Sequence, residues 1–329
     1  MRVARYHKKG PPEVLQVEDI ATPEPAEGEA LVRVEATGVT YADVLRRGEG
    51  YYPVQPKLPH IPGNLAVAMV EAVGPGGDAG LVGQRVLANV FTGAYAEQGL
   101  AKIATFRKIP DGVDPIDALA IFSEAETAGL AVRAAGKLQP GETVFVPAAT
   151  GGVGFLVVQF ARLWGAKRVF GAASTPEKRA VVESLGAIPI DYTIDGWSKE
   201  VIEKNEGRGV DLAFEVTGGP VFYETFNAVR PGGRVVNYGN VTDTDSPINP
   251  RQLLRKNQAL IGFYRGAGAA DNLFVEERAQ LYKDLDVMLA KGELKAAIGK
   301  TFTLDQAADA HRALEGRASP GKVILLPNG

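Results

Sequence analysis

One segment constrains the fold more than any other, the glycine-rich run Pro-Ala-Ala-Thr-Gly-Gly-Val-Gly at residues 147–154. Apolar residues typical of a buried strand occupy 143–148, and an amphipathic pattern typical of a helix occupies 152–165. Glycines at such a turn let a phosphate approach the backbone N–H groups at the helix N-terminus. A second predicted strand at 167–172 completes the context, so Gly151, Gly152 and Gly154 predict a dinucleotide site. Measured against the pattern G-x-G-x-x-G, Ala149 replaces the first glycine.

The alternation of strand and helix continues through the middle of the chain. Further strands are predicted at 210–216 and 234–238, and further helices at 176–185 and 221–229. This rhythm predicts a parallel sheet with right-handed crossovers, which is a doubly wound α/β domain.

The two ends of the chain have a different pattern. The first 120 residues contain short alternating segments, such as 30–36, 67–73 and 84–90, that are typical of antiparallel strands. After two predicted helices, 276–290 and 305–314, a last apolar strand is predicted at 322–326. Because one strand is not stable alone, we expect it to rejoin the N-terminal β domain. Residues 1–120 and 263–329 then form one domain, and residues 121–262 form the inserted nucleotide-binding domain.

The end of the second strand of the inserted domain indicates which dinucleotide binds. A site for NAD usually places Asp or Glu there to accept a hydrogen bond from the ribose 2′-hydroxyl. This chain instead has no acid at the strand end, a hydroxyl at Ser174, and cations at Lys178 and Arg179. A 2′-phosphate prefers donors and cations to a carboxylate, so the sequence favours NADPH.

Composition excludes several classes of protein. The formal net charge of -3 argues against binding to nucleic acid. With 0 cysteines the chain has no disulfide, no thiolate nucleophile and no sulfur ligand for zinc, and its 3 histidines are far apart in the sequence. Apolar runs are too short to span a membrane, and the N-terminus lacks the apolar region of a signal peptide, so we expect a cytoplasmic protein with no membrane partner.

Two common sets of catalytic residues are also missing. None of the 10 tyrosines has a lysine four residues later, and no serine lies in Gly-x-Ser-x-Gly. Hydride transfer without a metal then remains. That chemistry suits an activated acceptor, a quinone or an α,β-unsaturated carbonyl, whose oxygen needs only a few hydrogen-bond donors.

Several short motifs, spread over nearly the whole chain, carry a family resemblance. They are GVTYAD at 38–43, YYP at 51–53, LPHIPG at 58–63, AATGGVG at 148–154, STPEK at 174–178, LGA at 185–187, RPGGR at 230–234 and GK at 321–322. With them the chain resembles the zinc-independent quinone oxidoreductase (zeta-crystallin-like) branch of the medium-chain dehydrogenase/reductase superfamily. The resemblance implies a GroES-like β domain formed by both chain ends, an inserted Rossmann domain, use of NADPH, a homodimer, and an active site in the cleft between the domains.

The resemblance also implies which residues bind and react. It assigns the nucleotide to Thr127, Gly151, Gly152, Val153, Gly154, Ser174, Lys178, Tyr192, Asn240 and Lys322. It assigns the substrate to Thr40, Tyr41, Tyr52 and the segment 263–265, in which Phe263 and Arg265 are also candidates for contact with the cofactor. Two positions depart from the family pattern: Thr40 stands where Asn is usual, and residues 64–68 (NLAVA) replace an acidic, glycine-rich run.

We therefore expect NADPH to give a hydride to the β-carbon of a quinone or conjugated carbonyl. The hydroxyl of Tyr41 or Tyr52, or backbone donors, then polarise the oxygen, and solvent supplies the proton. Purely structural roles also remain open for some of these side chains. Tyr51 and Tyr52 could pack a loop, and Tyr192 could pack in the core. Two other functions also stay open, a biosynthetic enoyl reductase or reductive cyclase with a larger substrate, and a nucleotide-binding protein without turnover.

Overall fold

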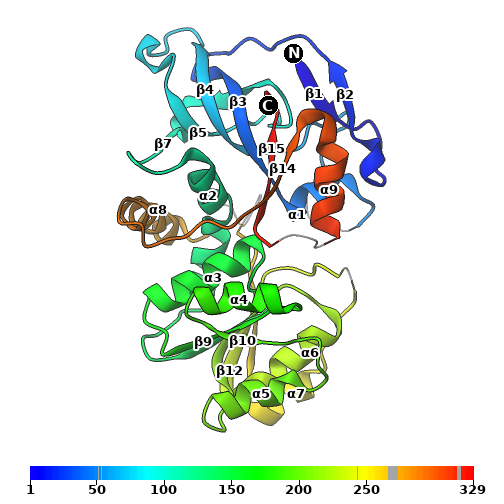
Figure 1. The fold of residues 1–329 in the computed structure, drawn as a ribbon, viewed down its shortest axis with the longest axis vertical. Coiled ribbons are helices and arrows are strands. Elements are labelled where there is room, and N and C mark those ends of the chain that lie inside the picture. Colours follow the sequence, from blue (N-terminus) through cyan, green and yellow to red (C-terminus); the bar gives the residue numbers. More distant parts are fainter. Residues whose placement is uncertain (51, 53, 243, 266–272, 317–319) are drawn as a thin grey trace. The chain divides into compact units, whose positions relative to one another are not determined.

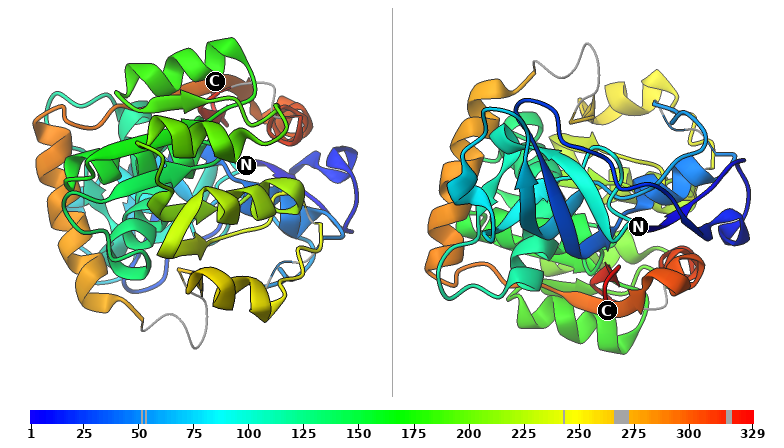
Figure 2. Two further views of the ribbon diagram at one scale, coloured as in Figure 1. Left: turned by 90° about the horizontal axis from the view of Figure 1, so that it is seen from below. Right: turned by 90° about the horizontal axis from the view of Figure 1, so that it is seen from above.

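The chain forms two compact units, and both chain ends belong to the first (Figures 1 and 2). The computed structural model describes residues 1–50, 52, 54–242, 244–265, 273–316 and 320–329. The first unit comprises residues 1–123 and 288–329, and the second comprises 124–287. The sequence placed the C-terminal boundary after residue 262, but residues 263–287 group with the second unit. The reason is tertiary: Leu281 and Tyr282 of helix α8 (Val275–Ala290) contact Gly129 and Glu126 of helix α2 (Pro115–Leu130).

A largely antiparallel sheet, which also contains the parallel pair β14–β15, forms the core of the first unit. Its strand order is β14-β15-β3-β4-β5-β7, with β6 paired to β3, and a separate ladder joins β1 and β2. Strand β3 alternates, so that Ala30, Val32 and Val34 are buried, as the sequence pattern predicts. The strands of this unit are β1 (Arg2–Arg5), β2 (Gln16–Asp19), β3 (Glu29–Val39), β4 (Leu65–Val73), β5 (Arg85–Asn89), β6 (Gln98–Lys102), β7 (Arg107–Lys108), β14 (Ile298–Thr303) and β15 (Lys322–Leu326).

The C-terminal strand joins this sheet as predicted. β15 pairs antiparallel with β3, where Ile324 lies opposite Gly38. Helices α1 (Tyr41–Arg47) and α9 (Ala307–Glu315) also belong to the first unit. The two chain ends thus build one GroES-like domain, which confirms the predicted fold class.

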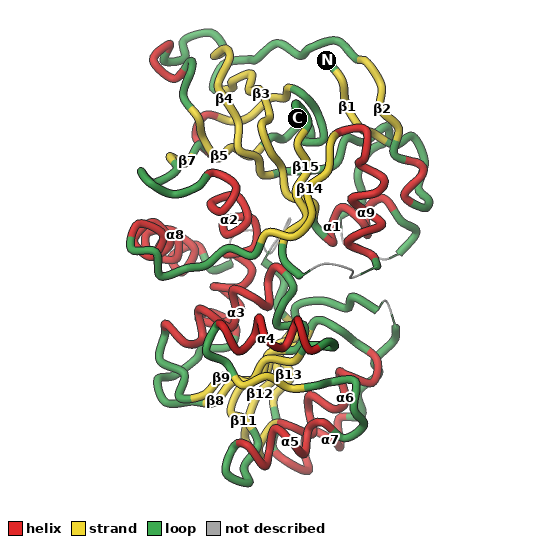
Figure 3. Tube along the Cα trace, viewed as in Figure 1, coloured by secondary structure: helices red, strands yellow, loops and turns green. Residues whose placement is uncertain are grey.

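The second unit is built on a six-stranded sheet in which every pairing is parallel, with the order β10-β9-β8-β11-β12-β13. This is the doubly wound Rossmann arrangement that the alternation predicts. Figure 3 shows α3 and α4 on one face of the sheet and α5, α6 and α7 on the other. The strands are β8 (Thr143–Val146), β9 (Arg168–Ala172), β10 (Ile188–Ile190), β11 (Val210–Glu215), β12 (Val229–Asn237) and β13 (Ala259–Gly262). The helices are α3 (Gly152–Leu163), α4 (Pro176–Ser184), α5 (Trp197–Lys204), α6 (Gly219–Ala228) and α7 (Pro250–Lys256).

Some elements differ in detail from the prediction. Helix α2 ends at Leu130 and continues as a π-helical turn, Ala131–Ala135. Two strands of the sheet, β10 and β13, were not predicted, because both are short and only partly buried.

Candidate functional site

The glycine-rich turn connects the fully buried strand β8 to α3. Ala148 adopts a positive φ of 48°, and the Gly151 N–H donates to the Ala148 carbonyl oxygen at 2.9 Å. A Cβ on Gly154 would lie 2.4 Å from that same oxygen, so only glycine fits there. Gly151 is the N-cap of α3 and has no side chain to cap it, which leaves the first-turn N–H groups open to a ligand.

Ala149, which replaces the first glycine of the motif, is accommodated by a second glycine. Ala149 is fully buried, and a Cβ on Gly171 of β9 would lie only 2.9 Å from its methyl group. The space that Gly171 leaves empty therefore admits the alanine. The departure from the usual pattern is compensated inside the fold and does not disturb the turn.

The next strand, β9, leads to Ser174 and to α4. Thr175 caps α4 by accepting from the Lys178 N–H at 3.3 Å, so Lys178 lies in the first helical turn. Arg179 has another role than the sequence suggests: it forms an ion pair with Asp191 at 2.8 Å and donates to the Ala173 carbonyl at 3.3 Å. The pKa of Asp191 is lowered, first by the Thr193 hydroxyl and also by Arg179. Asp191 is thus an acid of this region that sequence reasoning did not identify.

Other predicted cofactor residues of the second unit differ in exposure. Tyr192 packs against the hydrophobic core cluster of the sheet, in agreement with the structural role that was left open for it. Asn240 is exposed beyond β12 and donates to the Thr244 carbonyl at 3.0 Å. Phe263 is buried directly after β13, and its N–H donates to the Asn237 carbonyl at 2.8 Å. Thr127 is half-buried on α2.

Two acids on α2 also belong to this region. A Cβ on Gly152 would lie 3.0 Å from Cγ of Glu124, so this side chain packs against the glycine-rich turn. Glu126 forms an ion pair with Arg265 at 3.4 Å. Both carboxylates lie in the second half of a largely apolar helix, but their direction depends on the tertiary fold.

Four predicted residues belong to the first unit. Thr40 is the N-cap of α1 and forms a reciprocal capping box with Asp43: its hydroxyl accepts from the Asp43 N–H at 3.2 Å, and the Asp43 carboxylate accepts from the Thr40 N–H at 3.0 Å. The Thr40 hydroxyl also donates to that carboxylate at 2.6 Å. Tyr41 begins the same helix and is half-buried. Lys322 is only 4% exposed, and the absent side chain of Gly38 makes room for it.

Tyr52 is joined to the end of α1 by an arginine that the sequence did not single out. Arg46 donates to the Tyr52 hydroxyl at 3.4 Å, and its guanidinium lies 4.6 Å from the ring centroid. The neighbouring Tyr51 lies outside the described residues. Within the first unit, α1 therefore links Thr40 and Tyr41 at its start to Tyr52 at its end.

In the second unit, the predicted residues gather at one edge of the parallel sheet. The glycine-rich turn, Ser174, Asn240 and Phe263 follow β8, β9, β12 and β13, and carboxyl ends of parallel strands share an edge. No group of three His, Asp or Glu side chains suited to a metal occurs among the described residues. A search of the same residues found no helix long and apolar enough to cross a membrane.

Comparisons with known proteins agree with this architecture. Residues 26–113 match the alcohol dehydrogenase GroES-like domain, and residues 152–282 match the family described as zinc-binding dehydrogenase. Human quinone oxidoreductase is 33% identical over 330 residues, which covers 99% of this chain and 98% of the relative. A 2-haloacrylate reductase from a Burkholderia species is 30% identical and covers 98% of both. The quinone oxidoreductase of Thermus thermophilus, also solved as a complex with NADPH, has a TM-score of 0.83 and 34% identity over 99% of this chain and 100% of its own.

A GroES-like domain with an inserted Rossmann sheet and a glycine-rich turn defines the class of medium-chain dehydrogenases and reductases. Within that superfamily, the chain belongs to the quinone oxidoreductase branch. It is accordingly an oxidoreductase that binds a nicotinamide cofactor and acts on a small molecule.

Proposed function

We propose that the protein uses NADPH to reduce a quinone or an α,β-unsaturated carbonyl by hydride transfer, without zinc. The glycine-rich turn carries this proposal, since Gly154 and the open N-terminus of α3 form a site suited to a dinucleotide pyrophosphate. The preference for NADPH is supported by Ser174 and Lys178, at a strand end without an acid. The absence of cysteine in the sequence supports reduction without a thiolate-bound metal.

NADPH, when bound, supplies the hydride that the carbon of the acceptor receives. The first turn of α3 holds the pyrophosphate, and Lys178 holds the 2′-phosphate. In the first unit, the Tyr52 hydroxyl accepts a hydrogen bond from Arg46 and so has its own proton available for the acceptor oxygen. Thr40 keeps α1 in place through its capping box, and solvent supplies the one proton that the reduction needs besides the hydride.

The test is NADPH oxidation, followed by absorbance, against a panel of neutral quinones and enones. We expect turnover with at least one class, and its loss in the Gly154→Ala variant. NADPH binding without oxidation of any acceptor would contradict the proposal and favour a nucleotide-binding protein without turnover. Products identified by mass spectrometry would separate a simple reduction from a reductive cyclisation.

A second candidate substrate class is an enoate, a conjugated acid that carries a carboxylate. Two arginines end α1: Arg47 is buried and paired with Glu315, whereas Arg46 has no carboxylate partner among the described residues. A half-buried guanidinium beside Tyr52 suits a substrate carboxylate. The similarity to a 2-haloacrylate reductase favours the same class.

This candidate is tested with matched substrates, an acrylate and its neutral methyl ester. Replacing Arg46→Gln should raise KM for the acid by about tenfold more than KM for the ester, because only the acid loses a charge-assisted hydrogen bond. Equal losses for acid and ester would show instead that Arg46 only supports Tyr52.

A homodimer is also proposed from the family resemblance, and sedimentation equilibrium tests it.

A further inference from the structure

Glu126 is the centre of a charged cluster of residues that lie far apart in the sequence. Its side chain is 13% exposed on α2, and its carboxylate accepts from Arg278 Nε at 2.9 Å and from the Tyr282 hydroxyl at 2.5 Å. Arg265 approaches the same carboxylate at 3.4 Å. Arg278 also donates to the Arg265 backbone carbonyl at 3.1 Å, so the cluster fixes both the main chain and the side chain of Arg265.

Attachment of α8 does not by itself explain this cluster. Leu281 of α8 fills the space above Gly129, where a Cβ would lie 2.5 Å from its side chain. Asp284 pairs with Arg133 of the π-helical turn and gives α8 a second ionic tether. The contact that Glu126 adds, and that these tethers lack, is the one to Arg265.

The position and charge of Arg265 give that contact a functional meaning. Arg265 follows Phe263 by two residues, at the carboxyl edge where the glycine-rich turn also lies, and its side chain is 47% exposed. One carboxylate is shared by two guanidiniums, so the three side chains keep a net charge of about +1. Arg265 is therefore oriented without being neutralised, which leaves N–H groups able to bind an anionic ligand.

We propose that Glu126 is a positioning residue that holds Arg265 for binding an oxygen of the nicotinamide dinucleotide. This inference rests on the proposed function. Glu126 acts through Arg265, so its removal releases the guanidinium and weakens cofactor binding even though Glu126 itself carries the same charge sign as the cofactor. A purely electrostatic role would give the opposite result, because removing a carboxylate near a phosphate would strengthen binding.

The experiment measures the Kd for NADPH by fluorescence titration and the Tm of four variants. They are Glu126→Gln, Arg265→Gln, the double variant, and Asp284→Asn as a matched control that removes the other ionic tether of α8. We expect about a tenfold rise in Kd for each of the first two, from the loss of one charge-assisted hydrogen bond. The double variant should be no worse than Arg265→Gln alone, because the two residues act as one unit. Asp284→Asn should lower Tm without changing Kd.

Several results would overturn the inference. NADPH binding by Glu126→Gln within twofold of wild type, or tighter than wild type, would contradict it, and so would an effect that adds fully to that of Arg265→Gln. If Glu126→Gln does not fold, the half-exposed Arg265 still decides, since wild-type affinity in Arg265→Gln would be equally contrary. A wild-type protein that binds no NADPH would overturn the proposed function itself, and a wild type that binds NADPH with unchanged variants would overturn only the role of Glu126.

Discussion

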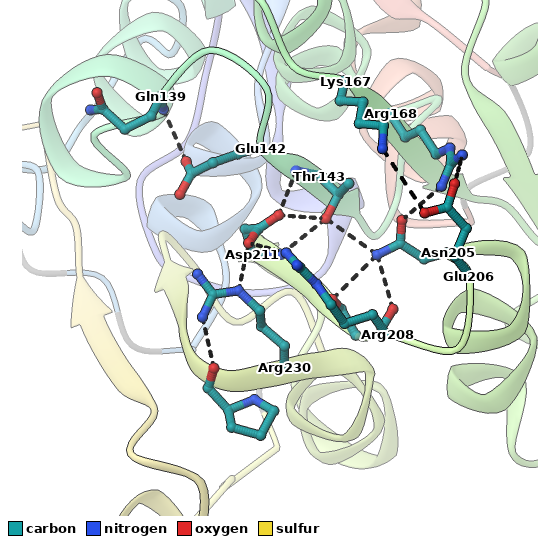
Figure 4. Close-up of polar contacts among 12 residues, drawn as sticks. Gln139, Glu142, Thr143, Lys167, Arg168, Asn205, Glu206, Arg208, Asp211 and Arg230 are labelled. Carbon is teal, nitrogen blue, oxygen red and sulfur yellow. Dashed lines mark hydrogen bonds and ion pairs between the residues drawn. The ribbon is translucent and has the colours of Figure 1, made fainter.

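The two edges of the parallel sheet use charged side chains in opposite ways. At the amino edge, Asp211 is 6% exposed and its two oxygens accept four hydrogen bonds (Figure 4). The donors are the Thr143 N–H and hydroxyl at 2.8 Å and 2.7 Å, Arg208 at 3.0 Å, and Arg230. A carboxylate offers about four lone-pair positions, so this network is complete without any ligand.

The carboxyl edge, in contrast, leaves several polar groups exposed. Gly151 is exposed at the start of α3, Asn240 is exposed beyond β12, and the Arg265 guanidinium is half-exposed although Glu126 holds it. A saturated network stabilises the fold, and a network with donors directed outward is suited to bind a ligand. Substitutions at the amino edge should therefore change stability, and those at the carboxyl edge should change affinity.

The largest expected effect is at the glycine-rich turn. In Gly154→Ala the new methyl would lie 2.4 Å from the Ala148 carbonyl oxygen, so the turn must shift. Overpacking of this kind costs about 3 kcal/mol, which is roughly a 100-fold rise in the Kd for NADPH if the strain is concentrated in the binding turn. Fluorescence titration measures it, and Gly262→Ala is the control, because a Cβ at Gly262 meets nothing within 4 Å. Similar losses in both variants would refute the steric explanation.

At the amino edge, Asp211→Asn should destabilise the protein without affecting cofactor binding. The amide cannot accept from Thr143, Arg208 and Arg230 together, and the half-buried Arg230 loses its carboxylate partner. We expect a loss of about 3 kcal/mol in the free energy of unfolding, measured with urea. Asp191→Asn is the control, because its ion pair with Arg179 is more exposed and should contribute less than about 1 kcal/mol. A changed Kd for NADPH in Asp211→Asn would contradict the separation of the two edges.

The sequence predicted this sheet well because its signals are local. The strand–turn–helix pattern around Gly151 and the apolar segment before Pro147 contain their own periodicity, and both were found where expected. Thr40 and Asp43 give a further local signal. Their T-x-x-D spacing is typical of a capping box, and in the structure the Thr40 hydroxyl takes part in one.

Contacts between distant segments could not be predicted from the same patterns. The assignment of 263–287 to the second unit depends on Glu126 meeting Arg278 and Tyr282 across more than 150 residues. Arg179 lies after β9, and Asp191 directly follows β10. Their ion pair therefore depends on β10 lying beside β9. Periodicity identifies the strands, but the register that brings two charges together follows from packing of the whole sheet.

At the amino edge, the difference in the free energy of unfolding between wild type and Asp211→Asn should depend on pH. Burial alone would raise the pKa of Asp211, but the hydrogen bonds from Arg230 and Thr143 outweigh it and lower the pKa from 3.8 to about 2. Because the pKa is lower in the folded state, the carboxylate stabilises the protein above pH 3.8, and this is lost as the pH falls towards 2. The free energy of unfolding that this carboxylate contributes falls by about 2 kcal/mol over this pH range. Urea unfolding from pH 5 to pH 2 should thus bring wild type and Asp211→Asn closer by that amount, and a constant difference would contradict the assignment.

The smallest expected effect is a difference between two adjacent cations at the carboxyl edge, Lys178 and Arg179. The Arg179 guanidinium is bound to Asp191 at 2.8 Å and to the Ala173 carbonyl at 3.3 Å, so its charge is already compensated. Lys178 is the cation that the proposed NADPH site uses. We expect Lys178→Gln to lower the ratio of NADPH to NADH affinity by about tenfold, and Arg179→Gln to change it by less than about threefold. Calorimetric titration of both dinucleotides measures the ratio. An equal loss in Arg179→Gln would mean that the phosphate displaces Asp191, and the carboxyl edge would then contain a pair that opens on binding, in contrast to the saturated network around Asp211.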